Sequence, residues 1–436
     1  MKYKYFPQTE EDIKAMLSKI GATSLEALYA EVPEEVKLNK DYALPKAKSE
    51  IELRRYFNDL AAKNTPLTIF AGGGAYDKYV PSIIPSLTSR EEFRTSYTPY
   101  QAEISQGTLH YIFEYQTMMS RLTGMAVSNA SMYDGTTATA EAMLMANAVN
   151  KKASKVLISE TIDPKTAAVV RTYAHFHGVE IDTIGEKDGM TDKVDMEKKL
   201  ANGDVAGVIV QQPNYYGNIE DFSDFADDCH AQKALFIMNC IAADLAILKT
   251  PGEWGADIAV GEGQSLGIPL NFGGPYIGYM CCTEKLMRKM PGRIVGQTVD
   301  SHGERTFVLT LQAREQHIRR QKATSNICSN ESLMALWISI YLSVMGKEGV
   351  KEAAMLSYNG AHYMCERLEK TGHFKKKYAQ PFFNEFCMTY DGDVDAFRKK
   401  CEKAGFMAGL KIDEHTIMFA VTEKRSKEEI DKLAEL

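Results

Sequence analysis

Apolar residues recur at helical spacing near the start of the chain. Residues 9–21, TEEDIKAMLSKIG, place Thr9 and Asp12 at the spacing of a capping box and end at Gly21, which predicts a helix. Residues 49–64, SEIELRRYFNDLAAKN, repeat the same period after Pro45. We therefore expect residues 1–65 to form an N-terminal helical arm rather than an independent domain.

From residue 67 the pattern changes to short, nearly continuous apolar runs, most of them separated by amphipathic or Ala-rich segments. Such an alternation is typical of an α/β fold whose mainly parallel sheet is covered by helices on both faces. Ligands of these folds bind beyond the carboxyl ends of the strands. We assign residues 66–330 to this large domain, with predicted strands at 67–74, 155–160, 179–185, 205–213, 234–240 and 256–260.

The remaining residues, 331–436, predict a small C-terminal α+β domain. The apolar run 333–345 is too short to span a bilayer and indicates a buried helix. Further elements are expected at 382–390 (strand), 394–405 (helix), 409–412 and 416–422 (strands), and from 426 (helix).

Composition and charge narrow the function classes. The formal net charge of -7, with acids and bases interspersed along 436 residues, offers no broad basic surface for nucleic acid or anionic lipid. The eight cysteines form no CxxC pair, which favours reduced thiols in a cytoplasmic protein. The nine histidines show no metal-ligand spacing, so we expect no metal site. The N-terminus lacks the apolar core of a signal peptide, and neither export nor membrane insertion is expected.

A first candidate site is the start of the Ala-rich segment after NASMYDGTTATAEA. A glycine turn and hydroxyl groups at a helix N-terminus can hold a phosphate, because the backbone NH groups and the helix dipole favour an anion there. The same residues also suit an N-cap without any ligand, which is the commoner case. They are Asp134, Gly135, Thr136 and Thr137.

Two further segments collect polar side chains. The window SYTPYQAEISQG contains Tyr97 and Tyr100, which could stack on a substrate, or could equally be packing residues of a surface loop. The window QAREQHIRRQKATSNIC places cations ahead of Thr324, Ser325 and Asn326. Cations followed by small polar groups suit a phosphate or carboxylate. The cations are Arg314, His317, Arg319, Arg320 and Lys322.

The glycine-rich stretch GEGQSLGIPLNFGG, residues 261–274, follows the predicted strand 256–260. In many pyridoxal phosphate (PLP) enzymes a loop of this kind carries the lysine that binds the cofactor as a Schiff base. Gln264 stands where that lysine would be sought. Other chemistries find less support, since the chain has no G-x-S-x-G, no P-loop and no G-x-G-x-x-G after its first strand.

The motifs TPYQAEISQG, NASMYDGTTATAEA, GIPLNFGGP, MPGRIVGQTVD and LQAREQHIRRQKATSNIC together resemble the glycine-cleavage P-protein family, the PLP-dependent glycine decarboxylases. The resemblance runs along the whole chain, and it is to the N-terminal half of that family, which many bacteria make as a separate subunit 1. It implies a type I PLP-dependent aminotransferase-like fold with a large cofactor-type domain and a small C-terminal domain.

Two positions depart from the cofactor-carrying half of the family. Alignment on the Ile-Pro pair places Gln264 at the Schiff-base lysine, and an amide cannot condense with the aldehyde. The strand that usually ends in the aspartate facing the pyridine nitrogen ends here in FIMNC, offering Asn239. A neutral amide cannot balance a pyridinium charge. The resemblance therefore implies a chain that forms only part of the active enzyme.

On this basis the resemblance implies a subunit without its own cofactor that lends residues to a PLP site held by subunit 2. Thr324, Ser325 and Asn326 would reach the phosphate, and Tyr97 and Tyr100 would face glycine. The aminomethyl group left by decarboxylation would pass to the lipoyl arm of the H-protein, and the assembly expected is an α2β2 heterotetramer.

Two alternatives remain open at this point. The chain could be a purely structural or regulatory partner of subunit 2 that does not contact substrate. It could also be a stand-alone PLP enzyme that uses another lysine, such as Lys249 or Lys322, although neither has the flanks of a strand-end loop.

Overall fold

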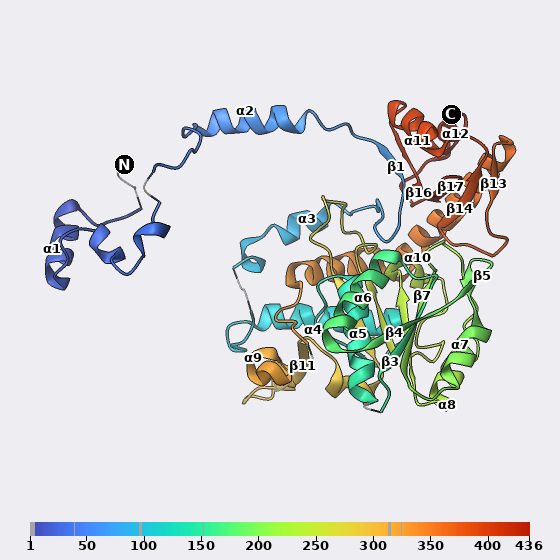
Figure 1. Cartoon of the computed structure of the whole chain (residues 1–436), viewed down its shortest axis with the longest axis horizontal. Coiled ribbons are helices and arrows are strands. Elements are labelled where there is room, and N and C mark those ends of the chain that lie inside the picture. The colour runs from blue at the N-terminus through green and yellow to red at the C-terminus, as the bar shows by residue number, and fades with distance from the viewer. Residues whose placement is uncertain (1–4, 39, 96–97, 151, 313–314, 324) are drawn as a thin grey trace. The chain divides into compact units, whose positions relative to one another are not determined.

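The structure is a computed structural model that describes residues 5–38, 40–95, 98–150, 152–312, 315–323 and 325–436. Backbone contacts divide the chain into two units, Met1–Thr65 and Pro66–Leu436 (Figure 1).

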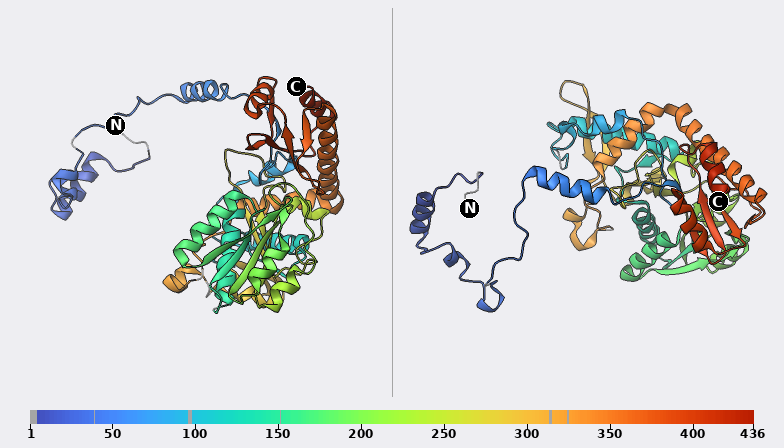
Figure 2. Two further views of the ribbon diagram at one scale, coloured as in Figure 1. Left: turned by 45° about the vertical axis from the view of Figure 1, so that its right-hand side comes forward. Right: turned by 90° about the horizontal axis from the view of Figure 1, so that it is seen from above.

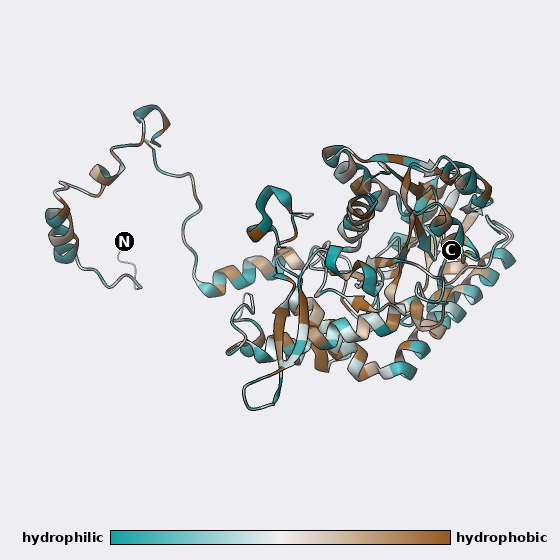
Figure 3. Ribbon diagram, turned by 90° about the horizontal axis from the view of Figure 1, so that it is seen from below, coloured by the Kyte–Doolittle hydropathy of each residue, from teal (hydrophilic) through white to brown (hydrophobic). Residues whose placement is uncertain are grey.

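The first unit is an extended arm with two α-helices, α1 (Glu10–Ile20) and α2 (Glu50–Ala61). The predicted capping box is confirmed: the Thr9 hydroxyl accepts from the Asp12 amide at 3.2 Å, and the Asp12 carboxylate accepts from the Thr9 amide at 2.8 Å. Neither helix contains a buried residue, although apolar and polar positions alternate along both (Figure 3). The described part of the arm therefore builds no core of its own.

The second unit is organised around a seven-stranded sheet of order β2-β10-β9-β8-β7-β3-β4. Strands β9, β8, β7, β3 and β4 are parallel, and β10 is antiparallel to both of its neighbours, so the mainly parallel sheet expected from the sequence is confirmed. The strand bounds are β2 (Val127–Ser128), β3 (Lys155–Ser159), β4 (Glu180–Ile184), β7 (Val205–Gln212), β8 (Leu235–Cys240), β9 (Ile258–Glu262) and β10 (Gly278–Cys282).

Helices cover both faces of this sheet (Figure 1, Figure 2). Successive strand residues point to opposite faces, so in β3 Ile158 packs in one core with α5 and α6, and Leu157 packs in another with α7 and α8. Most positions of the inner strands β7, β8, β9 and β10 are apolar because both faces of the sheet are covered. The helix bounds are α4 (Gln106–Thr123), α5 (Gly135–Val149), α6 (Pro164–His177), α7 (Lys193–Leu200) and α8 (Phe225–Ala231).

The C-terminal part contains a four-stranded antiparallel sheet of order β13-β14-β17-β16, with a core of its own around Phe386 and Phe419. The strands are β13 (Phe374–Lys376), β14 (Glu385–Tyr390), β16 (Leu410–Asp413) and β17 (Thr416–Ala420), and the helices are α10 (Ser332–Lys370), α11 (Val394–Lys403) and α12 (Lys427–Ala434).

Helix α10 contains the apolar run that the sequence assigned to a buried helix. By length and composition alone it is apolar enough to cross a membrane, but a non-helical residue, Gly346, interrupts it. Its buried residues include Met334, Ile338 and Tyr341, which lie in a core together with residues of α4, β9 and β10. This packing is that of a core helix in a folded domain.

Two features differ from the sequence-based expectation. The run 67–74 yields β1 (Thr68–Phe70), which pairs in parallel with β15 (Phe406–Ala408) outside the main sheet, so its assignment to that sheet is wrong. Left-handed Gly73 and Gly74 turn the chain just after β1. The hairpin of β11 (Ile294–Val299) and β12 (Arg305–Thr310) was not anticipated, because its far end is polar and exposed. The remaining short α-helices and strands among the described residues are α3 (Ile83–Thr88), β5 (Glu186–Lys187), β6 (Met190–Thr191) and α9 (Gln316–Arg319).

Candidate functional site

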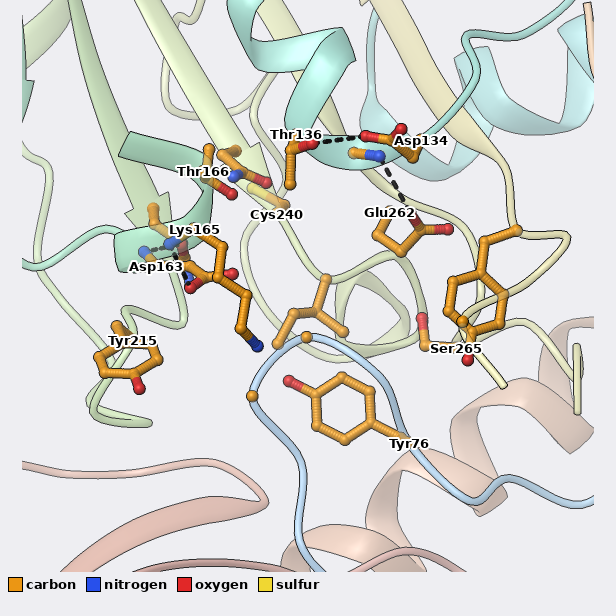
Figure 4. Close-up of a pocket in the computed structure, with 18 of the residues that line it drawn as sticks. Tyr76, Asp134, Thr136, Asp163, Lys165, Thr166, Tyr215, Cys240, Glu262 and Ser265 are labelled. Atoms are coloured by element: carbon orange, nitrogen blue, oxygen red, sulfur yellow. Dashed lines mark hydrogen bonds between the residues drawn. The ribbon is translucent and has the colours of Figure 1, made fainter. Parts of the chain in front are cut away.

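A cavity of about 490 Å³ lies at the carboxyl ends of the central strands (Figure 4). Gln211, Asn239 and Glu262 line it from the ends of β7, β8 and β9, and the starts of α5 and α6 complete that side. The loop after β1 and Glu385 of β14 close it from the other side. This is the edge of the sheet where ligands of doubly wound folds bind.

Gln264 is fully buried beside this cavity and is not one of the described residues that line it. Its Oε1 accepts from the Tyr76 amide at 2.8 Å. Its Nε2 donates to the carbonyls of Tyr76, at 2.8 Å, and Ile268, at 2.6 Å. The side chain therefore fastens the loop after β9 to the Tyr76 segment and does not reach into the cavity.

The start of α5 has the geometry of an N-cap in which the amides of Gly135 and Thr137 already have acceptors. Asp134 Oδ1 accepts from the Thr137 amide at 2.8 Å and from the Thr136 hydroxyl at 2.6 Å. Glu262 Oε2 accepts from the Gly135 amide at 2.9 Å (Figure 4). Two carboxylates of the chain thus take the place that an anionic ligand would need.

The cavity wall is strongly acidic. Burial raises the pKa of Glu262 and Glu385 to about 7, and it also raises the pKa of Asp163. Of the described lining residues only Lys165 is a cation. The carboxylates are Asp134, Asp163, Glu262, Glu331 and Glu385.

These residues do not fit PLP. Gln264 has no amine and is bonded to backbone, and the anion position at α5 is filled by Glu262. Asn239, which lines the cavity at the end of β8, is a neutral amide where a pyridinium requires a carboxylate. Gln264 therefore cannot form a Schiff base with PLP in this cavity.

A second cluster gathers around Arg293, which is 4% exposed. Its Nη2 donates to the Tyr100 hydroxyl at 3.0 Å, and its Nη1 donates to the Ser329 hydroxyl at 3.2 Å. Its Nε lies 3.8 Å from the Glu315 carboxylate, and the His317 ring meets the Tyr100 ring edge-on with centroids 6.1 Å apart. The Arg293 guanidinium therefore brings together the motifs TPYQAEISQG, MPGRIVGQTVD and LQAREQHIRRQKATSNIC.

The predicted phosphate-contact residues are only partly described. Ser325 donates to Glu141 Oε1 at 2.7 Å and accepts from the Ile327 amide at 3.0 Å, whereas Asn326 is exposed. Burial raises the pKa of Glu141 to about 7, and the Ser325 hydrogen bond opposes that rise. Thr324 and Tyr97 lie outside the described residues, so the structure does not test their predicted roles.

The segment that follows Ser325 borders the cavity. The Cys328 amide donates to the Tyr133 hydroxyl at 2.9 Å, and the Glu331 amide donates to the Ser131 hydroxyl at 2.9 Å. Tyr133 and Glu331 both line the cavity. Residues 325–331 therefore lead from Ser325 to the wall of the cavity.

The other candidate cations that the structure describes lie on the surface. His317, Arg319, Arg320 and Lys322 are exposed, and Arg314 lies outside the described residues. Lys249 is exposed beside the Trp254 ring. Neither Lys249 nor Lys322 lines the cavity within the described chain, and the described residues contain no group of metal ligands.

Sequence analysis missed Arg293, Glu141 and Glu262. Glu141 offered a signal, since a single acid inside the apolar run of α5 is seldom buried without a partner. Glu262 ends a buried strand, where polar groups mark a site. Arg293 offered none, because its partners come from other parts of the chain.

The sequence profile of the family described as "Glycine cleavage system P-protein" matches residues 3–436. The chain is 47% identical to the "Probable glycine dehydrogenase (decarboxylating) subunit 1" of Desulforamulus reducens, covering 99% of this chain and 98% of that protein. A crystal structure of glycine decarboxylase (P-protein) in inhibitor-bound form has a TM-score of 0.92 at 41% identity, covering 100% of this chain and 99% of that one.

Lactobacillus brevis glutamate decarboxylase has a TM-score of 0.69 at 12% identity, covering 94% of this chain and 96% of that one. At this identity the likeness concerns the fold alone, which is the type I fold of PLP-dependent enzymes. The full-length sequence matches show that the chain belongs to the glycine cleavage system P-protein family and groups with its subunit 1 members.

Proposed function

We propose that this chain is the subunit of a glycine decarboxylase that does not hold the cofactor, and that it acts only together with subunit 2. The observation that carries the proposal is the burial of Gln264, whose amide is bonded to the backbone at the position of the Schiff-base lysine. PLP held by subunit 2 supplies the chemistry that drains electrons from glycine as carbon dioxide leaves.

The residues of this chain then act by positioning. Arg293 fixes the Tyr100 hydroxyl, while the ring stays half exposed to face glycine in the partner's site. Glu141 accepts a hydrogen bond from Ser325, so that Ser325 and the exposed Asn326 can contact the phosphate of the cofactor held by subunit 2. Thr324 and Tyr97 are proposed to act with them.

The N-terminal arm supports the need for a partner. Its helices bury none of their residues, and within the arm Ile51, Tyr56 and Phe57 are more than half exposed. Apolar side chains in this number are a mark of a protein interface. We propose a cytoplasmic α2β2 assembly with subunit 2, which delivers the aminomethyl group to the lipoyl arm of the H-protein.

The test is to purify the chain alone, subunit 2 alone and the two together, and to measure glycine-dependent exchange of carbon dioxide. Borohydride treatment followed by mass spectrometry shows which chain carries covalent PLP. We expect exchange only from the mixture and the adduct only on subunit 2. An adduct on a lysine of this chain would overturn the proposal.

A further inference from the structure

Three carboxylates on one wall of the cavity have no cationic partner among the described residues, although backbone amides donate to two of them, Asp134 and Glu262. They are Asp134, Glu262 and Glu331. Burial first, and then the charge of Asp134, raise the pKa of Glu331, and Asp134 also raises the pKa of Glu262. The charge of Lys165 acts instead on Asp163 and Glu385, and Lys165 and Asp163 lie together on the side away from Asp134 and Glu262 (Figure 4).

An unpartnered amide faces the same space. Asn239 is 9% exposed and lines the cavity, and its side chain has no hydrogen-bond partner among the described residues. Buried amides normally make hydrogen bonds, and a carboxamide can both donate and accept. Asn239 therefore points to a ligand with a polar group at the floor of the cavity.

The chemistry of the wall excludes two classes of ligand. An anion would compete with Glu262 for the Gly135 amide and would meet the other carboxylates. A single metal ion needs several ligands around one point, and the described residues contain no such group. What fits is an extended molecule that carries its positive charge at one end.

We propose that the cavity binds a small aliphatic amine, whose ammonium group lies against Asp134, Glu262 and Glu331 and whose other end meets Asn239. The volume of about 490 Å³ is within the range of small-molecule sites. The rings of Tyr133 and Tyr276 line the space and suit the carbon chain of such a ligand. Amine binding at this wall goes beyond the glycine reaction proposed above and is independent of it.

Isothermal titration of the full chain with 4-amino-1-butanol tests the proposal, with 1,4-butanediol as a neutral probe of similar length. We expect saturable binding at one site for the amine and none for the diol. The double variant Asp134→Asn with Glu331→Gln removes two charges and keeps the shapes, and Asn remains a good N-cap. It should weaken amine binding by about tenfold or more, since each charge-assisted hydrogen bond contributes strongly.

Glu197→Gln, on the exposed face of α7, is the matched control and should bind like the wild type. Absence of saturable amine binding would overturn the proposal, as would equal binding of the diol or unchanged binding by the double variant. If the double variant does not fold, the comparison of amine with diol on the wild-type chain still tests whether the cavity binds an amine. Exchange of carbon dioxide is measured separately, so failure of the amine site leaves the proposed function untouched.

Discussion

The buried guanidinium of Arg293 donates to the hydroxyl of Tyr100 at 3.0 Å, although the two residues are 193 positions apart. The Tyr100 ring is 51% exposed, whereas Arg293 is 4% exposed. The hydrogen bond from Arg293 fixes the orientation of the exposed Tyr100 side chain. A partner or substrate that binds Tyr100 therefore restricts little further conformational freedom of this side chain.

Arg293→Lys tests this positioning role. Lysine keeps the charge but has a single nitrogen in place of the planar fork of arginine, so it should not hold Tyr100 and Ser329 in the same geometry. We expect glycine-dependent carbon dioxide exchange by the assembled enzyme to fall about a hundredfold, as for misplaced catalytic groups, with assembly retained in size-exclusion chromatography. Arg305→Lys, on the exposed end of the hairpin, should exchange normally. Full activity of Arg293→Lys would show that the hydrogen bond from Arg293 to Tyr100 is not required for the reaction.

Tyr100→Phe separates a substrate-contacting subunit from a purely structural partner. The change keeps the ring and removes the hydroxyl that Arg293 holds. If Tyr100 serves glycine chemistry, exchange should fall about a hundredfold, the effect of losing a proton-transfer group. Turnover equal to wild type, together with normal assembly, would favour the structural alternative.

Gln264→Lys should not convert the chain into a PLP enzyme. The lysine would lie against the Tyr76 backbone rather than in the cavity, and the anion position at α5 would still be taken by Glu262. The Tyr76 amide would lose its acceptor, at a cost of about 2 kcal/mol in the free energy of unfolding. Thermal unfolding and borohydride trapping with PLP measure both effects, with exposed Gln232→Lys as the control. Efficient trapping at residue 264 would contradict the description of the cavity.

Glu385 should make stability depend on pH. Burial raises its pKa from 4.5 to about 7, so between these values the folded chain holds a proton that the unfolded chain releases. The contribution of Glu385 to the free energy of unfolding is fully present below pH 4.5 and is lost as the pH rises through 7.

Glu385→Gln cannot ionise but keeps an oxygen for the Gly73 amide, which now donates to Glu385 Oε1. From about pH 5 to 8 the free energy of unfolding of the wild type should therefore fall relative to the variant by up to about 3 kcal/mol. Urea titrations across this range measure the difference. Parallel pH curves for the two proteins would show that the carboxylate is not buried as described.

The sequence by itself determined the α/β class, the parallel strands and the capped helices, because hydrophobic period and capping residues are local properties. It also showed that residue 264 is an amide, and chemistry alone forbids a Schiff base there. The capping box of Thr9 and Asp12 is a case where every partner lies within four residues.

Only the tertiary structure decided where these groups point. Gln264 is hydrogen-bonded to Tyr76, 188 residues away, Arg293 donates to Tyr100, and Glu262 at the end of β9 accepts from the Gly135 amide at the start of α5. It likewise paired β1 with β15 and not with the main sheet. Each of these contacts joins distant segments whose approach depends on the packing of the whole domain, and no local pattern of residues encodes such an approach.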